Sequence, residues 1–380
     1  METKKYRFDE VTINFDKKRI PLSSAQREKR QGTFRYYGAQ GVIDHVDDYI
    51  FDGTYLLIAE DGENLKSKKQ NIAQVVDGQF WVNNHAHIVQ GNEQCDTRFL
   101  CYLINSMDLS GYVTGSAQPK LSQANLNAIT LSLPTLVEQK RIVEYLYMLD
   151  QKIDVNRQIN DNLEQQAQSY FQELFVDNAS PEWTTGTISD LGTVVGGSTP
   201  SKTKPEYYTE SGIAWITPKD LSINKSKFVS HGENDITELG LKNSSAAIMP
   251  EGTVLFSSRA PIGYIAIAAG EVTTNQGFKS VVPKPEIGTP FVYFFLKNTL
   301  PVIEGMASGS TFKEVSGSTM KNVPAVIPDA ETLAKFSDFC APIFAQQRIL
   351  EEQNQSLATL RDNLLPKLMS GEIDVSAVQL

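Results

Sequence analysis

Two long stretches of the chain repeat apolar residues in alternating steps of four and three. This spacing places apolar side chains along one seam of an α-helix and is typical of coiled coils. It predicts one helix over 135–178 and a second over 329–380. The principal seam positions are Ile142, Leu146, Leu149, Ile153, Asn160 and Leu163 in the first helix, and Ile343, Leu350, Asn354 and Leu357 in the second.

Sequence signals also mark the starts of both helices. Thr135 followed by Glu138 forms a capping box, and Asp329 is a candidate N-cap of the second helix. A seam of about 33 residues, rising about 1.5 Å per residue, is roughly 50 Å long. The simplest arrangement packs the two seams against each other. Within them, Asn160 and Asn354 either fix the register or are solvated interruptions.

A gapless internal repeat relates the two halves of the chain. GSAQPKLSQANLNAITLSLP (115–134) aligns with GSTFKEVSGSTMKNVPAVIP (309–328) at a constant offset of 194 residues, which is 309 minus 115. The same offset superimposes the two helical seams. The chain is therefore built twice.

Upstream segments share an order of strands. DGTYLLIAEDG from Asp52 resembles EGTVLFSSRAPIG from Glu251, and WVNNHAHIV (81–89) resembles VTTNQGFKSVV (272–282), which gives Asn84 and Asn275 the same relative place. We predict an α+β chain of two pseudo-repeated mixed α/β domains, 1–134 and 179–328, separated by two long antiparallel coiled-coil helices. The first domain lacks the opening seen as WTTGTISDLGTVVGG from Trp183, so we expect its first strand to be unusual or trimmed.

Charge limits the kind of partner. The net charge of −10 argues against a protein that coats DNA non-specifically. Residues 1–37 nevertheless carry ten Lys or Arg against five acids, which is either a solvated surface or a basic face. The charged N-terminus and the lack of an apolar run of about 18 residues predict a cytoplasmic protein without membrane contact.

Candidate catalytic and metal motifs are weak. GGSTPSKT (196–203) resembles a phosphate loop but has Ser201 where the second glycine belongs, so we interpret it as a turn whose Lys202 contacts phosphate or as a surface loop. His85 and His87 alternate on a predicted strand, but no third metal ligand follows. The three cysteines fit no zinc spacing, and no methyltransferase tetrapeptide occurs. We expect no catalytic residue, metal or cofactor.

Several segments together resemble the specificity (S) subunits of type I restriction-modification systems. They are YYGAQGVID, FDGTYLLIAEDG, PTLVEQKRIVEYLYMLDQKID, GGSTPSKTKPEYY, WITPKDL and LLPKLMSGEI. The resemblance covers essentially the whole chain in the order target-recognition domain 1 (1–134), spacer helix 1 (135–178), target-recognition domain 2 (179–328) and spacer helix 2 (329–380).

The resemblance implies a non-catalytic DNA-binding protein of the cytoplasm. Each recognition domain would read one half of a bipartite double-stranded target, while the helices set the spacing and dock two DNA methyltransferase (M) subunits. Restriction (R) subunits would join where the system has a nuclease. Two alternatives stay open: a specificity subunit of a methyltransferase-only or other phage-defence system, and a coiled-coil scaffold without DNA readout.

Readout chemistry selects the candidate DNA-binding residues. Asn and Gln pair with adenine and Arg and Lys with guanine, beside backbone-contacting Ser, Thr and Lys. In the first domain the candidates are Tyr37, Gln40, Asn84, His85, Gln118 and Lys120; in the second they are Lys202, Lys219, Ser258, Arg259, Asn275, Gln276, Thr311 and Lys313.

Overall fold

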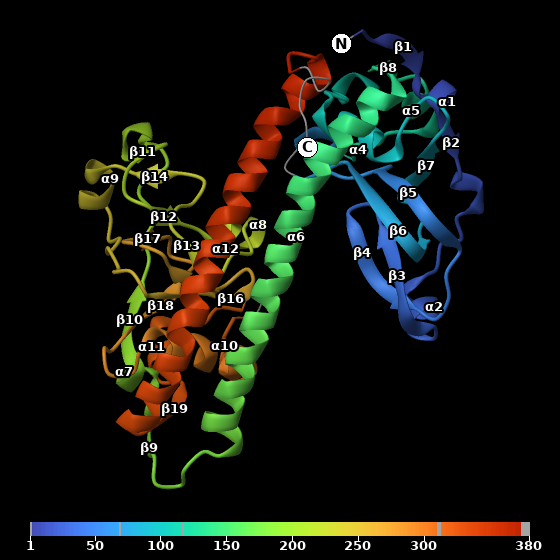
Figure 1. Cartoon of the computed structure of the whole chain (residues 1–380). Helices are drawn as coiled ribbons and strands as arrows, with labels where there is room; N and C mark the ends of the chain where they lie inside the picture. The colour runs from blue at the N-terminus through green and yellow to red at the C-terminus, as the bar shows by residue number, and fades with distance from the viewer. Residues whose placement is uncertain (1, 68–69, 116–117, 310–312, 374–380) are drawn as a thin grey trace. The chain divides into compact units, whose positions relative to one another are not determined.

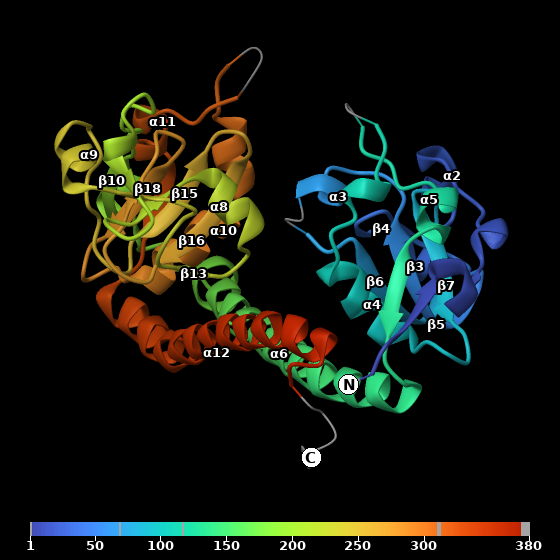
Figure 2. The ribbon, with the colours of Figure 1, turned by 90° about the horizontal axis from the view of Figure 1, so that it is seen from above.

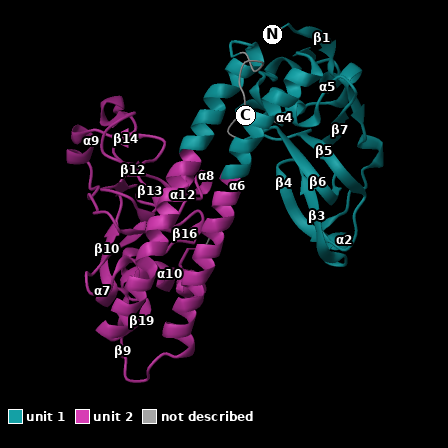
Figure 3. Ribbon diagram, viewed as in Figure 1, with its two compact units in different colours: residues 1–152, 356–380 teal, residues 153–355 magenta. Residues whose placement is uncertain are grey.

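The computed structural model describes residues 2–67, 70–115, 118–309 and 313–373, whose elements are labelled in Figure 1 and, turned by 90°, in Figure 2. The chain divides into two compact units (Figure 3). Unit 1 comprises Met1–Lys152 and Ser356–Leu380, and unit 2 comprises Ile153–Gln355. Each unit therefore contains a part of both long helices.

Unit 1 is built on a mixed six-stranded sheet. Its strands are, in spatial order, β2 (Thr12–Asn14), β7 (Ala86–Gly91), β5 (Phe51–Ala59), β6 (Ala73–Val82), β3 (Gln31–Gly38) and β4 (Gly41–Val46). Only β3 and β6 pair in parallel. The other elements are β1 (Lys4–Arg7), α1 (Phe8–Val11), η1 (Asp16–Lys18), α2 (Ser24–Glu28), α3 (Asn64–Ser67), α4 (Thr97–Ser106), η2 (Ser110–Tyr112), α5 (Gln123–Asn127) and β8 (Thr130–Leu133).

The core of unit 1 lies between the sheet and helix α4. Asp96 caps α4 by accepting hydrogen bonds from the N–H groups of Arg98 and Phe99, 2.9 and 3.0 Å long. The helix packs against β5, β6 and β7, so that Phe99 and Ile104 are buried with Leu56 of β5. Helix α4 therefore covers one face of the sheet, and the connecting loops lie at the ends of the strands.

Unit 2 has a five-stranded sheet. Its order is β10 (Gly192–Gly196), β18 (Lys279–Pro283), β15 (Val254–Ser258), β16 (Ile262–Ala268) and β13 (Phe228–Val229), which can be followed in Figure 2. Helix α10 (Thr289–Gly305) packs against β15, β16 and β18. The other elements are β9 (Thr184–Thr187), α7 (Ile188–Leu191), η4 (Pro205–Tyr207), β11 (Tyr208–Thr209), β12 (Trp215–Ile216), α8 (Pro218–Ile223), β14 (Asp235–Ile236), α9 (Glu238–Lys242), β17 (Thr273–Thr274), α11 (Gly317–Lys321) and β19 (Pro324–Ile327).

Both units open with the same strand, short helix and strand. In unit 1 this opening is β1, α1 and β2, with β1 antiparallel to β8; in unit 2 it is β9, α7 and β10, with β9 antiparallel to β19. Phe8 and Ile188 are both fully buried at the start of the short helix. The expectation of an unusual or trimmed first strand is therefore wrong. KKYRFDEV forms the same structure as TTGTISDL because the burial pattern is kept although the letters differ.

The two long helices are α6 (Leu136–Gln172), followed by the π-helical turn η3 (Glu173–Asp177), and α12 (Ala330–Ser370). The predicted capping box is confirmed, because Thr135 N–H donates to Glu138 Oε2 over 2.9 Å and Glu138 N–H to Thr135 Oγ1 over 3.4 Å. Asp329 likewise accepts from the N–H of Thr332, 2.9 Å away. The second helix ends before Gly371, whose φ of 76° suits a residue without Cβ.

The predicted seam residues are covered in the structure. Ile142, Leu146, Ile153, Ile343 and Leu350 are buried, and Leu149, Asn160, Leu163, Asn354 and Leu357 are half-buried. In unit 2, Asn156 donates to Asn354 Oδ1 over 2.9 Å, and the Gln347 side chain donates to Asn160 O over 3.2 Å. Within this unit the partners advance along α6 as they recede along α12, so these segments run antiparallel.

A buried polar cluster joins α6, α10 and α12 to the sheet of unit 2. Lys227, whose side chain is 6% exposed, donates to Glu164 over 2.7 Å and to Gln347 over 2.9 Å. Lys297 and Tyr293 also contact Glu164, the latter through a 3.1 Å hydrogen bond. Burial lowers the pKa of Lys227 to about 8 against the opposing effect of Glu164. Glu164 is thus the shared acceptor of two cations.

Candidate nucleic-acid interface

The same main-chain frame occurs in both units where a central strand ends. In unit 1, Glu60 follows β5 and its carbonyl accepts from Leu121 N–H over 2.8 Å; in unit 2, the carbonyl of Ser258 accepts from Val315 N–H over 2.9 Å. The next residue forms an isolated antiparallel β-bridge with the neighbouring loop of the same unit, Asp61 with Lys120 and Arg259 with Glu314. We call 60–61 and 258–259 the strand end, and 120–121 and 314–315 the return loop.

A tight asparagine turn completes this frame. Asn83 Oδ1 accepts from His85 N–H, and Asn275 Oδ1 accepts from Gly277 N–H, both over 2.8 Å. The carbonyls of His85 and Gly277 accept in turn from the N–H groups of Glu60 (2.9 Å) and Ser258 (2.7 Å). The frame therefore consists of the strand end, the return loop and the asparagine turn, 83–85 or 275–277.

This turn corrects two sequence expectations. Asn83, not Asn84, occupies the place of Asn275, and Asn84 matches Gln276. The predicted strand through both histidines is also wrong, because β7 begins at Ala86 and His85 lies in the turn. The alternation argument required both residues on one strand, whereas the asparagine turn divides the predicted strand between the end of β6 at Val82 and the start of β7 at Ala86.

Most predicted residues of unit 1 gather on exposed loops around its frame. Gln40, Asn84, His85, Gln118 and Lys120 are exposed. Tyr37 is buried beside Phe80, and burial raises the pKa of its hydroxyl. Gln40, at the turn between β3 and β4, donates to Asn64 over 3.3 Å. Tyr37 therefore supports the sheet, and five of the six candidates remain available to a ligand.

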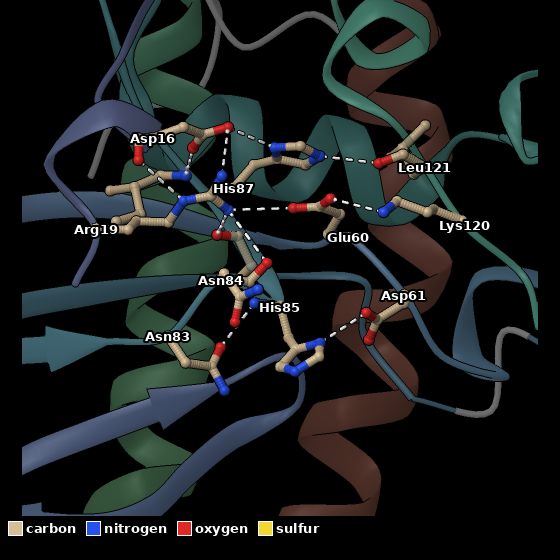
Figure 4. Close-up of polar contacts among 12 residues, drawn as sticks. Asp16, Arg19, Glu60, Asp61, Asn83, Asn84, His85, His87, Lys120 and Leu121 are labelled. Carbon is tan, nitrogen blue, oxygen red and sulfur yellow. Dashed lines mark hydrogen bonds and ion pairs between the residues drawn. The ribbon is translucent and has the colours of Figure 1, made fainter. Parts of the chain in front are cut away.

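Beneath these loops lies a buried ionic network (Figure 4). The His87 side chain, 1% exposed, lies between Asp16 Oδ2 at 2.7 Å and Leu121 O at 2.8 Å. Asp16 Oδ1 also accepts from Ile88 N–H over 2.8 Å. Burial opposes ionisation of Asp16, but the hydrogen bonds from His87 and Ile88 outweigh it and hold its pKa below the usual range. The network anchors the return loop from below.

Arg19 connects this network to the surface. Its guanidinium donates to Ala86 O over 2.7 Å and to Glu60 Oε2 over 3.1 Å (Figure 4). Glu60 in turn pairs with Lys120 at 3.2 Å, and Asp61 pairs with His85 at 2.7 Å. Arg19 was not among the sequence candidates, since nothing in its local sequence signals contacts with residues more than forty positions away.

The two candidate histidines, His85 and His87, do not converge on a shared group. His85 and His87 have separate carboxylate partners, Asp61 and Asp16. Among the residues that the structure describes, no group of three or more His, Cys, Asp or Glu side chains could hold a metal ion.

In unit 2 the candidates separate into exposed and covered groups. Lys202, Lys219, Gln276 and Lys313 are exposed, Arg259 and Asn275 are half-buried, Ser258 is fully buried, and Thr311 lies outside the described residues. The Ser258 hydroxyl donates to Gly277 O over 3.1 Å, so it holds the frame. Lys219 pairs with Glu233, and Gln276 accepts from the hydroxyl of Thr199. Of the exposed group, Gln276 belongs to the asparagine turn, and Lys313 immediately precedes the return loop.

GGSTPSKT forms a surface loop beside the asparagine turn. Ser198 N–H donates to Thr274 O over 2.8 Å, and Tyr208 donates to Pro200 O over 2.6 Å. The loop leads into the single 3₁₀ turn η4 rather than into the α-helix whose N-terminus a phosphate loop requires. The loop also contacts the turn directly, because the Thr199 hydroxyl donates to the Gln276 side chain.

Several arginines of the basic N-terminal segment are paired with acids of the same unit. Arg27 pairs with Asp44 at 2.8 Å and Arg30 with Asp47 at 2.8 Å. Arg30 also lies over the ring of Trp81, 4.8 Å from its centroid. These arginines therefore secure the β3–β4 hairpin.

Over the described part of the chain, no helix is long and apolar enough to cross a membrane.

Comparisons with known proteins agree along most of the chain. The family model of the type I restriction modification DNA specificity domain matches residues 2–165 and 181–360. The MjaIX specificity subunit of Methanocaldococcus jannaschii is 40% identical over 48% of this chain and 44% of that protein. The HindI specificity subunit of Haemophilus influenzae is 24% identical over 85% of this chain and 84% of that protein. The crystal structure of a type I S subunit from M. genitalium has the same fold, with a TM-score of 0.60 and 15% identity over 97% of this chain and 96% of that one.

Proposed function

This chain belongs to the family of type I restriction modification DNA specificity domains, and from that premise we propose that it reads a bipartite sequence in double-stranded DNA, one half-site per unit. The observation that carries the proposal is the frame that occurs once in each unit with different exposed side chains. Two frames with the same main-chain structure but different exposed polar side chains are suited to reading two different short sequences with the same geometry. The chain itself acts as a DNA-recognition subunit and supplies no catalytic group.

The exposed frame residues have the chemistry that base recognition requires. Asn84 and Gln276 occupy the same turn position, and both amides can pair with adenine. Lys120 and Arg259 can donate to guanine, and Lys202, Lys219 and Lys313 can contact phosphate. A side chain on a rigid turn loses little freedom on binding, which favours selective contacts.

The long helices would act as the spacer between the two units. We place the recognition domains at 1–134 and 179–328 and the spacer helices at 135–178 and 329–380, with the helices forming an antiparallel coiled coil. Support comes from the covered seam and from the antiparallel contacts of Asn156 and Gln347 within unit 2. Helices of 37 and 41 residues, at about 1.5 Å per residue, extend roughly 55–60 Å.

Two DNA methyltransferase subunits are the partners that this arrangement would dock, one for each half-site, and restriction subunits would complete a cleaving complex in the cytoplasm. The acidic outer surface of the first helix would repel phosphate and suits a protein partner. Glu144, Asp154 and Asp161 are exposed on it.

A selection from random DNA duplexes tests the proposal. The tagged chain would be purified with the methyltransferase subunits that accompany it, and bound duplexes would be sequenced. We expect a motif of two short fixed halves separated by an unread gap of constant length, because two reading surfaces at fixed separation select half-sites about one helical turn apart. An ungapped motif would assign reading to one unit alone, and no enrichment would leave a scaffold without DNA readout.

A charge in the helix seam should relax the gap. The change Leu163→Asp places a carboxylate among half-buried apolar residues, so we expect it to destabilise the helix pairing by about 2–4 kcal/mol. In the selection, this variant should accept gaps of several lengths while each half-site keeps its sequence. Gln158→Asp, an exposed position of the same helix, is the matched control. If both variants retain one gap length, the helices do not set the spacing.

A further inference from the structure

Each frame carries one ion pair between its strand end and its return loop, and the charges are reversed between the units. In unit 1 the acid is on the strand end and the base on the return loop, as Glu60 pairs with Lys120 at 3.2 Å. In unit 2 the base is on the strand end and the acid on the return loop, as Arg259 pairs with Glu314 at 3.5 Å.

The return-loop partners of the two ion pairs are equivalent positions, whereas the strand-end partners are neighbouring positions, because Glu60 matches Ser258 and Asp61 matches Arg259. Lys120 and Glu314 are 194 residues apart, the offset of the repeat, and each bridges both the strand end and the start of its own loop, Thr114 or Ser308. The main-chain frame is thus the same with either charge. The shared main-chain bonds therefore do not by themselves determine which side of the frame carries the cation.

We propose that Lys120 and Arg259 each read a guanine, one in each half-site, and that Glu60 and Glu314 are positioning residues that aim these cations. This rests on the proposed function and adds the identity of one base per half-site. Lys and Arg donate to O6 and N7 of guanine in the major groove, the commonest specific contact between side chain and base. The cations are 54% and 38% exposed, so both can reach a ligand.

A base contact explains the reversal better than a phosphate contact. Phosphates are alike in every half-site, so a frame that only bound phosphate would gain nothing from exchanging its charges. A neighbouring carboxylate also cancels much of the attraction to phosphate, whereas it fixes the direction of a donor. Exchanging acid and base moves the donor from one side of the frame to the other, which shifts the base that it reaches.

The two acids are held by further contacts, as positioning requires. Glu60 also accepts from Arg19, which is anchored on Ala86 O. Glu314 lies 3.7 Å from Lys279, whose ammonium donates to Gln276 O over 3.3 Å. In both units a second cation links the acid to the asparagine turn, because Arg19 also donates to Asn84 O over 3.4 Å and Lys279 donates to Gln276 O.

Binding of the wild-type complex and its variants to the selected duplex tests this inference. Each half-site should contain a guanine. For Arg259→Gln, discrimination for guanine at one position of the second half-site should fall about 5- to 150-fold, with the first half-site unchanged. Lys120→Gln should do the same at the first half-site alone. Arg157→Gln, which removes an exposed ion pair on α6, should leave both profiles unchanged.

The acids need a separate readout. Glu314→Gln should reduce guanine discrimination and also raise affinity for duplexes that lack the motif, since it removes a negative charge near phosphate; Glu314→Asp should restore the wild-type profile. A purely structural glutamate would change neither base preference nor non-specific affinity in this way. Thermal unfolding confirms that each variant folds.

Several outcomes would overturn the inference while the proposed function stands. One is a gapped motif whose half-sites lack guanine. Another is a uniform loss of affinity across all sequences in the Lys120 and Arg259 variants, which identifies phosphate contacts. The absence of any gapped motif for the wild-type complex would instead remove the proposed function.

Discussion

Replacing Glu164 by leucine is expected to lower the free energy of unfolding of unit 2 by about 3–5 kcal/mol, because it leaves the ammonium of Lys227 buried without its carboxylate. Lys227 would retain Gln347 and the ring of Phe344, 3.6 Å from the ammonium to the ring centroid, which stabilise a cation only in part. Denaturant unfolding followed by tryptophan fluorescence measures the change. We also expect the second half-site to be bound more weakly, since β13, which follows Lys227, loses one of its anchors and keeps the hydrogen bonds from Lys227 N–H and Phe228 N–H to Glu351.

A double variant separates loss of charge pairing from loss of packing. Glu164→Leu combined with Lys227→Met removes both charges, and replacing a buried pair by apolar side chains is often neutral. Most of the lost stability should therefore return. Glu251→Gln removes an exposed partner of Arg348 and should cost no more than about 1 kcal/mol. If Glu164→Leu matches this exposed control, the buried cluster does not hold the unit together.

The change Asp16→Ala is expected to have a comparable effect in unit 1, about 3–5 kcal/mol, because it leaves His87 and the N–H of Ile88 without their buried acceptor. The return loop should loosen with it, since His87 is bonded to Leu121 O. Hydrogen exchange at Leu121 and binding to the first half-site both report this loosening. Asp9→Asn, at an exposed ion pair with Arg7, serves as the control and should change neither.

Asp16 also predicts the direction of a pH dependence. Its pKa is lowered below the ordinary 3.8 in the folded chain, so folding favours the carboxylate. Its stabilisation is complete above pH about 4 and is lost as the pH falls through the lower folded pKa. Acid unfolding of Asp16→Asn should consequently show a weaker dependence on pH in this range than the wild type. Equal slopes for the two proteins would mean that Asp16 titrates alike in both states.

The repeat and the two long helices could be predicted from the sequence more accurately than the frame formed by the strand end, the return loop and the asparagine turn. Periodic apolar positions and the caps at Thr135 and Asp329 are local signals, and the structure has both helix starts where these signals lie. The first strand was expected to be unusual or trimmed because the short helix after it has Phe8 and Val11 in place of Ile188 and Leu191, within a different local sequence. The two short helices bury the same positions, but different residues occupy those positions.

The candidate site depended on signals that span the chain. The chemistry of the side chains was enough to select Lys120 and Arg259. Arg19 and Glu60, in contrast, come together only because β5 pairs with β7 and the segment after η1 places Arg19 on Ala86 O. Glu314 could have been found, since the gapless offset aligns it with Lys120 and displays the reversed charge. The turn was misplaced by one residue because Asn83 and Asn84 are adjacent and only the folded backbone shows which of them makes the turn.

The frame of each unit is held by main-chain hydrogen bonds, such as those from Glu60 N–H to His85 O and from Ser258 N–H to Gly277 O. Main-chain bonds are indifferent to most changes of side chain, so mutations at the exposed positions of the frame are nearly free of folding penalties. If these positions read DNA as proposed, their side chains can change without loss of the main-chain bonds that hold the frame. In that case the target sequence and the stability of the fold are separable properties of this chain, and a single substitution can alter the first without the second.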